Sequence, residues 1–167
     1  MLPAAHIFDR IKLLGSGAAG QSAIHRNTYG MSMEKRRVLL VDDEPSIVKM
    51  VAKRLEMAGY EVLTATDGED GLTKARIGKP DVIILDLMIP KLSGLEVCTA
   101  LKQDPAYRHI PIIMFTGKGQ SMDEILCREA GANAYINKPH GSQEILEQIE
   151  VLLGRMLSDG ASSSPSA

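Results

Sequence analysis

Charged and hydroxyl side chains directly follow four short apolar segments, and their types suit the transfer of a phosphoryl group. Asp42 and Asp43 follow VLLV, and Asp86 follows VIIL. Thr116 follows IIMF, and Lys138 follows AYIN. Carboxylates that lie a few ångströms apart repel one another, and a hard divalent cation with oxygen ligands, such as Mg²⁺, relieves that repulsion.

The same set of side chains provides the groups that attack on phosphorus requires. A carboxylate can act as a nucleophile and form an acyl phosphate. An ammonium group then neutralises charge on the transferred group, and a hydroxyl group donates a hydrogen bond to it. Gly117 has no side chain, which leaves space for an in-line approach. We therefore predict that Asp86 accepts a phosphoryl group and that Mg²⁺ is the cofactor.

These residues need elements that bring them together, and the pattern of residues 37–154 supplies such elements. Five apolar segments alternate with helical patterns, and three of them (VLLV, VIIL and IIMF) are continuous, as in parallel strands covered on both faces. Pro45 suits the first turn of a helix, and the apolar residues of 145–153 recur at helical spacing. Repeated strand–helix units predict a doubly wound sheet, which binds ligands at the carboxyl ends of its strands.

Composition limits the class of protein. The chain has 167 residues, of which 44% are hydrophobic and 24% charged, as in an ordinary globular domain with appendages. A net charge of −2 gives no overall attraction to nucleic acid or to anionic membranes. Cys98 and Cys127 have no partner at metal-binding spacing, and no apolar run reaches the ~20 residues of a membrane helix. We predict a cytoplasmic protein without a membrane segment.

Three segments of the chain differ in character. Residues 37–154 carry 13 basic and 18 acidic side chains, whereas residues 1–36 carry 5 basic and 2 acidic ones. The final SDGASSSPSA has no apolar periodicity, which is typical of disorder. The predicted boundaries are a flexible extension over 1–35, one domain over 36–154 and a disordered tail over 155–167.

A glycine pattern in the first segment points to other functions. Residues 15–20 read GSGAAG and match G-x-G-x-x-G, which occurs in dinucleotide sites and in the glycine loop of protein kinases. A dinucleotide site needs a full strand–helix–strand unit and an acidic residue about 20 positions later. The kinase pattern needs a lysine strand that this sequence lacks. We interpret the segment as a Gly/Ala linker.

Residues 36–154 resemble the receiver domain of response regulators. The motifs that carry the resemblance are VLLVDDE, VIILDLMIPKLSG, IIMFTG and AYINKP, in the family's order and spacing. The resemblance implies an α/β, flavodoxin-like fold with a five-stranded parallel sheet in the order 2-1-3-4-5 and five flanking helices. It also implies that Asp86 receives its phosphoryl group from a histidine kinase or a phosphotransfer protein. Such a domain is a switch and not a turnover enzyme.

The resemblance assigns a metal site to individual residues. Asp43, Asp86 and the backbone carbonyl of Met88 would bind Mg²⁺, and Asp42 would act through a water molecule. Asp42 and Asp43 also have a purely structural alternative, because Asp often caps a following helix.

The resemblance assigns a switch as well. Thr116 would move toward the phosphoryl group, the ring of Tyr135 would follow it inward, and Lys138 would pair with the phosphoryl charge. As structural alternatives, Thr116 suits a strand or turn, Tyr135 suits a half-buried strand, and Lys138 suits the surface. Three positions would set how fast the phosphoryl group is lost: Met88, Gly117 and Lys118.

The expected function is a stand-alone receiver that signals by docking through residues 121–153 to a protein target that the sequence does not identify. We expect no direct binding to DNA, and formation of a homodimer on phosphorylation stays open. One alternative is a receiver that belongs to a longer regulator or hybrid kinase. Another is a phosphohydrolase of the haloacid dehalogenase type. That chemistry needs an acid two residues after the nucleophile, where Met88 has only a thioether.

Overall fold

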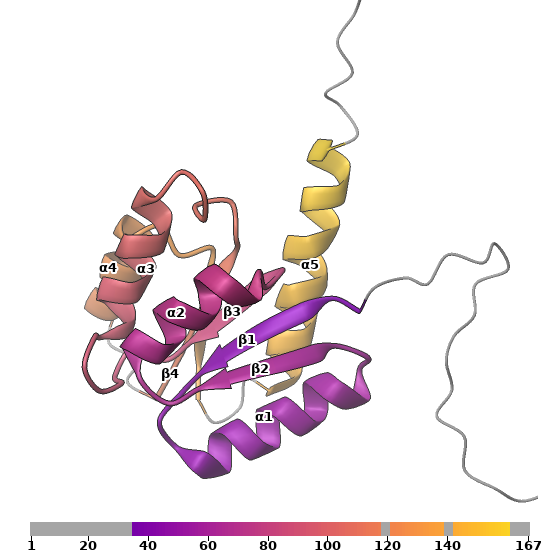
Figure 1. The fold of residues 1–167 in the computed structure, drawn as a ribbon, viewed down its shortest axis with the longest axis horizontal. Helices are drawn as coiled ribbons and strands as arrows, with labels where there is room; N and C mark the ends of the chain where they lie inside the picture. Colours follow the sequence, from indigo (N-terminus) through magenta and orange to yellow (C-terminus); the bar gives the residue numbers. More distant parts are fainter. Residues whose placement is uncertain (1–34, 118–120, 139–141, 161–167) are drawn as a thin grey trace, which may run out of the picture. The chain divides into compact units, whose positions relative to one another are not determined.

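The structure is a computed structural model that describes residues 35–117, 121–138 and 142–160, which form a parallel β-sheet flanked by helices (Figure 1). The strands are β1 (Arg37–Val41), β2 (Glu61–Ala65), β3 (Val82–Leu85), β4 (Ile112–Thr116) and β5 (Ala134–Asn137). Their order in the sheet is β2-β1-β3-β4-β5, and every neighbouring pair is parallel. The predicted fold class is confirmed.

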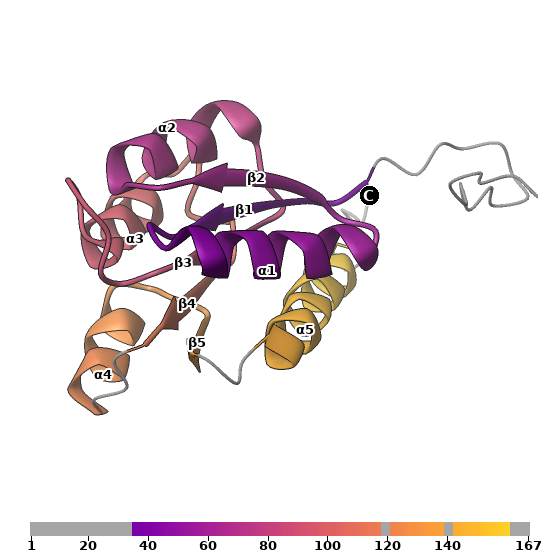
Figure 2. The same cartoon turned by 90° about the horizontal axis from the view of Figure 1, so that it is seen from below.

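Helices cover both faces of the sheet. They are α1 (Pro45–Met57), α2 (Gly68–Gly78), α3 (Gly94–Gln103), α4 (Ser121–Glu129) and α5 (Ser142–Gly160). Helices α1 and α5 contribute to one apolar cluster, and α2, α3 and α4 contribute to the other. Figure 2 shows α1 and α5 on the side of the sheet opposite α2.

The two apolar clusters explain why the central strands lack alternation. In β1, Val38 and Leu40 pack into the α1–α5 cluster, and Leu39 and Val41 pack into the cluster under α2 and α3. Residues 82–85 of β3 are likewise completely buried. Successive strand side chains point to opposite faces, so a strand between two helical layers must be apolar at every position. This packing fixes the carboxyl ends of β1 and β3 at one edge.

Helix α5 ends later than predicted. It runs to Gly160, six residues beyond the boundary that we placed at residue 154. Gly154 lies inside this helix, and a Cβ atom added to it would meet no atom within 4 Å. A glycine inside a helix costs only about 1 kcal/mol relative to alanine, and the Arg, Met and Leu that follow are good helix formers.

The remaining predictions about the chain ends lie outside the described residues. These are the flexible extension up to residue 34, its Gly/Ala linker and the disordered tail from residue 161. Among the residues that the structure does describe, none of the helices is both long enough and apolar enough to cross a bilayer.

Candidate functional site

The predicted site residues meet at the carboxyl edge of the sheet, because hydrogen bonds prolong the strands up to them. The backbone N–H of Asp42 donates to the carbonyl of Ala65 on β2 (3.0 Å). The backbone N–H of Asp86 donates to the carbonyl of Val41 on β1 (2.9 Å). Since β1 and β3 are neighbours with Val41 opposite Leu85, the two aspartates stand side by side.

Three carboxylates form a group that suits a hard cation. Asp42, Asp43 and Asp86 each offer a carboxylate oxygen, and these oxygens lie within 4.8 Å of one another. Asp42 is buried, Asp86 is only 7% exposed, and Asp43 is exposed on the solvent side. Mg²⁺ usually takes one or two protein carboxylates together with water and phosphate oxygens. The donor set therefore fits Mg²⁺.

Lys138 supplies the positive charge of the site. Its Nζ donates a hydrogen bond to Asp86 Oδ2 (2.8 Å) and forms an ion pair with Asp42 Oδ2 (2.5 Å). Its backbone N–H donates to the carbonyl of Thr116 (2.9 Å), which ties β5 to β4. The side chain is 10% exposed, and its Nζ lies 5.4 Å from the centre of the Phe115 ring. Burial opposes the charge on Lys138, but the bonds to Asp42 and Asp86 outweigh it, so the pKa is raised above its usual value.

Asp42 carries an electrostatic cost. Burial raises the pKa of its carboxyl group, and the nearby charge of Asp86 acts in the same direction. Lys138 and the backbone N–H of Glu44 act against this, but the pKa stays above its usual value. The contacts of Asp42 do not fully offset the cost of burying its charge. Among the described residues, its buried Oδ2 has no hydrogen-bond partner and makes only the ion pair with Lys138.

The capping alternative does not describe Asp42. The backbone N–H of Glu44 donates to Asp42 Oδ1 (2.9 Å), which is a local turn before α1. The N-cap residue of α1 is Glu44, and no side chain caps this end of the helix. Pro45 at the first helical position already lacks one of the N–H groups that a cap would satisfy.

We expect the Asp42→Asn variant to be more stable than the wild type when Mg²⁺ is chelated. A carboxyl group whose folded pKa is raised stabilises the fold below its unfolded pKa and loses that contribution as pH rises through the folded pKa. At neutral pH its charge is therefore a cost, and Asn removes it. We expect a gain of about 1 kcal/mol, the usual size of a single-residue effect.

Urea unfolding in EDTA measures this gain. It should shrink as pH falls toward the pKa of Asp42, where the wild type also becomes neutral. Asp70→Asn is the matched control, because Asp70 is partly exposed and, within the described part of the chain, its side chain pairs with Lys74 alone on the surface of α2. A wild type that is as stable as Asp42→Asn at neutral pH would contradict the prediction.

The loop after Asp86 is held by two glycines at which a side chain cannot fit. A Cβ on Gly94 would collide with the carbonyl oxygen of Asp86, and the Gly94 N–H donates to the carbonyl of Leu87 (3.0 Å). A Cβ on Gly68, the first residue of α2, would collide with the carbonyl of Leu92. Sequence reasoning missed Gly68, because its role depends on a contact between segments that no local pattern shows.

Lys91 also fixes this loop. Its φ of +67° lies in the left-handed region, which a lysine rarely adopts. Its Nζ pairs with Asp67 (2.8 Å) and with Glu69 (3.5 Å) at the start of α2. The Asp70 N–H that donates to Asp67, followed by Lys91, holds the pKa of Asp67 below its usual value. This ion pair was not predicted either.

The two predicted switch residues, Thr116 and Tyr135, lie on the neighbouring strands β4 and β5. Thr116 is buried at the end of β4, and Tyr135 is half-buried on β5. Tyr135 lies opposite Met114, two residues before Thr116, so both side chains belong to the same face of the sheet. Burial, then the nearby Asp123, Cys127 and Glu124, raise the pKa of Tyr135. That neighbourhood places the ring beside α4.

Two tuning positions face solvent. The Met88 side chain is 57% exposed, and its backbone N–H donates weakly to Asp86 Oδ1 (3.3 Å). Gly117 is exposed, and a Cβ atom added to it would meet open space. There is therefore room at this position for the in-line approach that we predicted. The third position, Lys118, lies outside the described residues.

Known proteins resemble this chain. The family model for the response regulator receiver domain matches residues 38–150. The alkaline phosphatase synthesis transcriptional regulatory protein PhoP of Bacillus subtilis is 44% identical over 120 residues, which cover 72% of this chain and 49% of PhoP. The DNA-binding dual master transcriptional regulator RpaA of Synechocystis sp. is 43% identical over 119 residues, 71% of this chain and 49% of RpaA. The chain spans about half the length of these curated relatives.

Solved structures resemble it as well. A CheY-like receiver domain protein from Methanospirillum hungatei JF-1 has a TM-score of 0.70 and 29% identity, covering 75% of this chain and 98% of that one. The receiver domain of sensor histidine kinase PA1611 from Pseudomonas aeruginosa PAO1 has a TM-score of 0.67 and 28% identity, covering 72% and 98%. That structure has a magnesium ion coordinated in its active-site cleft.

These relatives correct one prediction. The sequence led us to exclude direct binding to DNA, yet RpaA is named a DNA-binding regulator and PhoP a transcriptional regulatory protein. The exclusion was wrong because it rested on the net charge of this chain, which spans only about half the length of these relatives. The same relatives favour the alternative of a receiver within a longer regulator over a stand-alone one, and they give no support to a phosphohydrolase.

Proposed function

Because this chain belongs to the response regulator receiver domain family, we propose that it is a phosphoacceptor switch of a two-component system. Asp86 takes a phosphoryl group from a histidine kinase or a phosphotransfer protein. The observation that carries the proposal is the placement of Lys138, whose ammonium group contacts both Asp42 and Asp86 within one group of carboxylates. Asp86 is the one of these carboxylates that follows the central strand β3 and has Gly94 packed directly behind it.

The transfer step follows from the chemistry of these groups. A carboxylate oxygen of Asp86 attacks the phosphorus atom, a new C–O–P linkage forms, and the bond between phosphorus and the donor's nitrogen or oxygen breaks. The electron pair of the broken bond leaves with the donor. Lys138 pairs with the phosphoryl charge, and the Thr116 hydroxyl donates a hydrogen bond to a phosphoryl oxygen.

We propose that Asp43, Asp86 and the carbonyl of Met88 hold Mg²⁺, with Asp42 acting through water. A bound ion would offset the repulsion between the carboxylates and the incoming phosphoryl group. The carboxylates within 4.8 Å of one another and the magnesium in the cleft of the related PA1611 receiver support this assignment.

The switch is a shift between two states of the domain. A phosphoryl group on Asp86 favours the state in which Thr116 and Lys138 can reach it, and Tyr135 turns inward to follow Thr116. The surface of residues 121–153 then changes its fit for the downstream target. We propose that this receiver acts in the cytoplasm as part of a longer regulator of transcription. The transcriptional roles in the names of the relatives support the second part of this proposal.

Phosphorylation by a small-molecule phosphodonor tests the proposed function. Intact-mass spectrometry should show the gain of one phosphoryl group with Mg²⁺ and none in EDTA. Equal uptake in both conditions would contradict the magnesium site.

The phosphorylated form of the domain should lose its phosphoryl group slowly, because the Met88 thioether offers no group to orient water. We therefore expect no catalytic turnover of the donor. Met88→Asn should speed the decay.

A further inference from the structure

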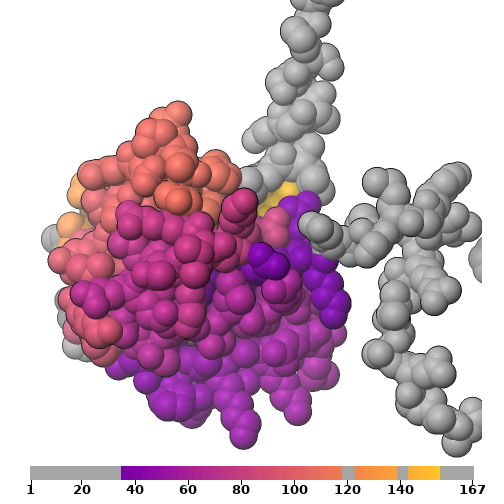
Figure 3. Space-filling model, in the orientation of Figure 1, coloured from indigo at the N-terminus to yellow at the C-terminus, as the bar shows by residue number. Residues whose placement is uncertain are grey.

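A second cavity lies at the edge of the sheet opposite Asp86. It encloses about 390 Å³ where the end of α2 meets the segment between α3 and β4, which lie side by side on the surface (Figure 3). Arg36 precedes β1, Asp81 precedes β3 and Ile110 precedes β4, so the amino ends of three strands border this cavity. It is therefore separate from the carboxylate site.

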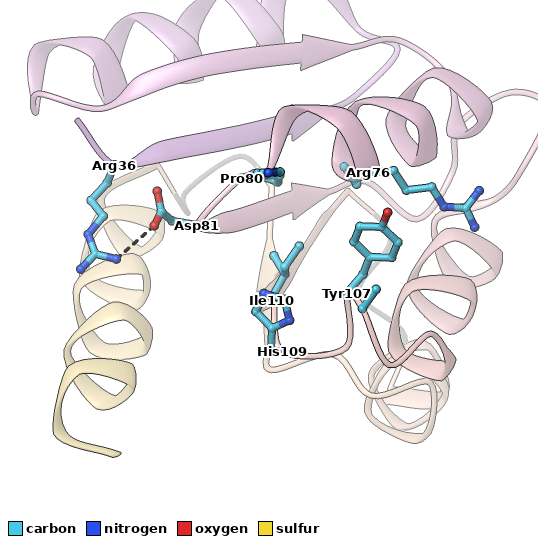
Figure 4. A pocket seen from close by; sticks show the side chains of 10 residues that line it. Arg36, Arg76, Pro80, Asp81, Tyr107, His109 and Ile110 are labelled. Atoms are coloured by element: carbon cyan, nitrogen blue, oxygen red, sulfur yellow. Dashed lines mark hydrogen bonds and ion pairs between the residues drawn. The ribbon is translucent and has the colours of Figure 1, made fainter. Parts of the chain in front are cut away.

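The inner wall of the cavity is apolar. Ala75, Pro80 and Ile110 are buried, and Tyr107 is half-buried beside them. Figure 4 shows Tyr107, Ile110 and Pro80 between Arg36 at one end and Arg76 at the other. The volume falls within the ~300–1,000 Å³ of ordinary small-molecule sites, which combine apolar walls with a few polar groups.

The rim is cationic in an otherwise acidic domain. Arg36, Arg76 and Lys79 border the cavity, against one carboxylate, Asp81. Asp81 pairs with Arg36 (3.1 Å) and also accepts the backbone N–H of Arg37 (2.7 Å). Within the described part of the chain, neither Arg76 nor Lys79 has a carboxylate within 4.0 Å. Two cations thus stand beside an apolar wall without a counter-charge.

A purely structural role does not account for these two cations. Cations near the end of a helix interact favourably with its dipole. Here, however, Arg37 Nη1 already donates to the carbonyl of Gly78 (2.6 Å) at the end of α2. The Arg76 guanidinium instead lies 6.0 Å over the ring of Tyr107, at the cavity. Lys79 adopts a φ of +46°, which a lysine rarely does, and its side chain is exposed at the rim.

We propose that this cavity binds a small organic anion: a phosphate or carboxylate head on an apolar body. The head pairs with Arg76 and Lys79, and the body packs against Tyr107 and Ile110. Arginine suits this task because its planar fork binds oxyanions through two parallel hydrogen bonds. Residues 1–36 carry 5 basic and only 2 acidic side chains, so their charge does not complement the rim.

Titration of the full chain with phenyl phosphate, followed through backbone amide signals by NMR, tests the proposal. EDTA is present throughout, so that the carboxylates near Asp86 repel the anion. We expect saturable shifts confined to residues 75–81 and 106–110. Phenol and inorganic phosphate should each bind at least about tenfold more weakly, because each lacks one of the two contacts. Benzoate in place of phenyl phosphate shows whether a carboxylate head serves as well.

Variants separate this site from general charge effects. Arg76→Gln and Lys79→Gln should each weaken binding about tenfold, as expected for loss of a charge-assisted hydrogen bond. Lys74→Gln removes a charge from the same helix but lies outside the cavity, and should leave binding unchanged. Equal effects of Lys74→Gln and Arg76→Gln, shifts centred near Asp86, or no saturation would overturn the proposal. So would tighter binding of a poly-glutamate peptide at the same residues, which would indicate a protein partner.

Discussion

Exchange of Asp86 for Asn is expected to abolish phosphoryl uptake from a small-molecule phosphodonor in the presence of Mg²⁺. The amide has no anionic oxygen to attack phosphorus, and loss of a catalytic nucleophile commonly costs a factor of about a thousand or more. Asn has almost the same shape as Asp, and its single amide oxygen keeps one of the two hydrogen bonds that Asp86 accepts through its two oxygens, from Lys138 and from the Met88 N–H. A lost signal would therefore report chemistry and not a damaged fold.

Two comparisons make this result decisive. Asp70→Asn, on the exposed side of α2, should take up phosphoryl as the wild type does. The thermal stability of Asp86→Asn should stay close to that of the wild type in EDTA. If the Asn variant still gained a phosphoryl group, another residue would be the acceptor and the site assignment would be wrong. Such an outcome would not contradict the proposed anion site, because the cationic cavity lies at the other edge of the sheet.

The fold was predictable because its core strands carry an unmistakable pattern. Residues 82–85 read VIIL and are buried on both faces, as expected for a short strand between two helical layers. The edge strand β2 is less clear, with Thr64 exposed and only Ala65 buried. Its place follows from the parallel strand order and not from its own composition. The convergence of Asp42, Asp86 and Lys138 was predictable for the same reason, since all three follow strands.

Features that depend on contacts between distant segments were not predictable. Lys91 reaches Asp67 only because the loop after β3 folds back on the start of α2, and the two residues lie 24 positions apart. The cavity beside Tyr107 arises where the end of α2 meets the segment before β4. Neither segment has a motif of its own. The late end of α5 was missed because the predicted boundary followed the end of the apolar periodicity near residue 154, although a helix can continue past its last core residue.

We expect Lys138→Met to be the most destabilising change at the site. Lys138 offsets two carboxylates whose side chains are 1% and 9% exposed, those of Asp42 and Asp86. Removing one partner of a buried ion pair leaves uncompensated charge and commonly costs about 3–5 kcal/mol. Urea unfolding in EDTA at neutral pH should show a loss of that size. Lys74→Met is the matched control, because both side chains of its ion pair with Asp70 are more than a third exposed and surface pairs are worth about 0–1 kcal/mol.

The pH dependence and a second substitution identify the cause of this loss. Without Lys138, the pKa of Asp42 rises further, because burial is no longer opposed by the ammonium group. A raised folded pKa means that stability is lost as pH rises, so the deficit of Lys138→Met should shrink as pH is lowered. Adding Asp42→Asn to Lys138→Met removes the stranded charge and should recover much of the loss. If the double variant is no more stable than Lys138→Met, the methylene packing of Lys138 against Phe115, and not its charge, holds this edge of the sheet together.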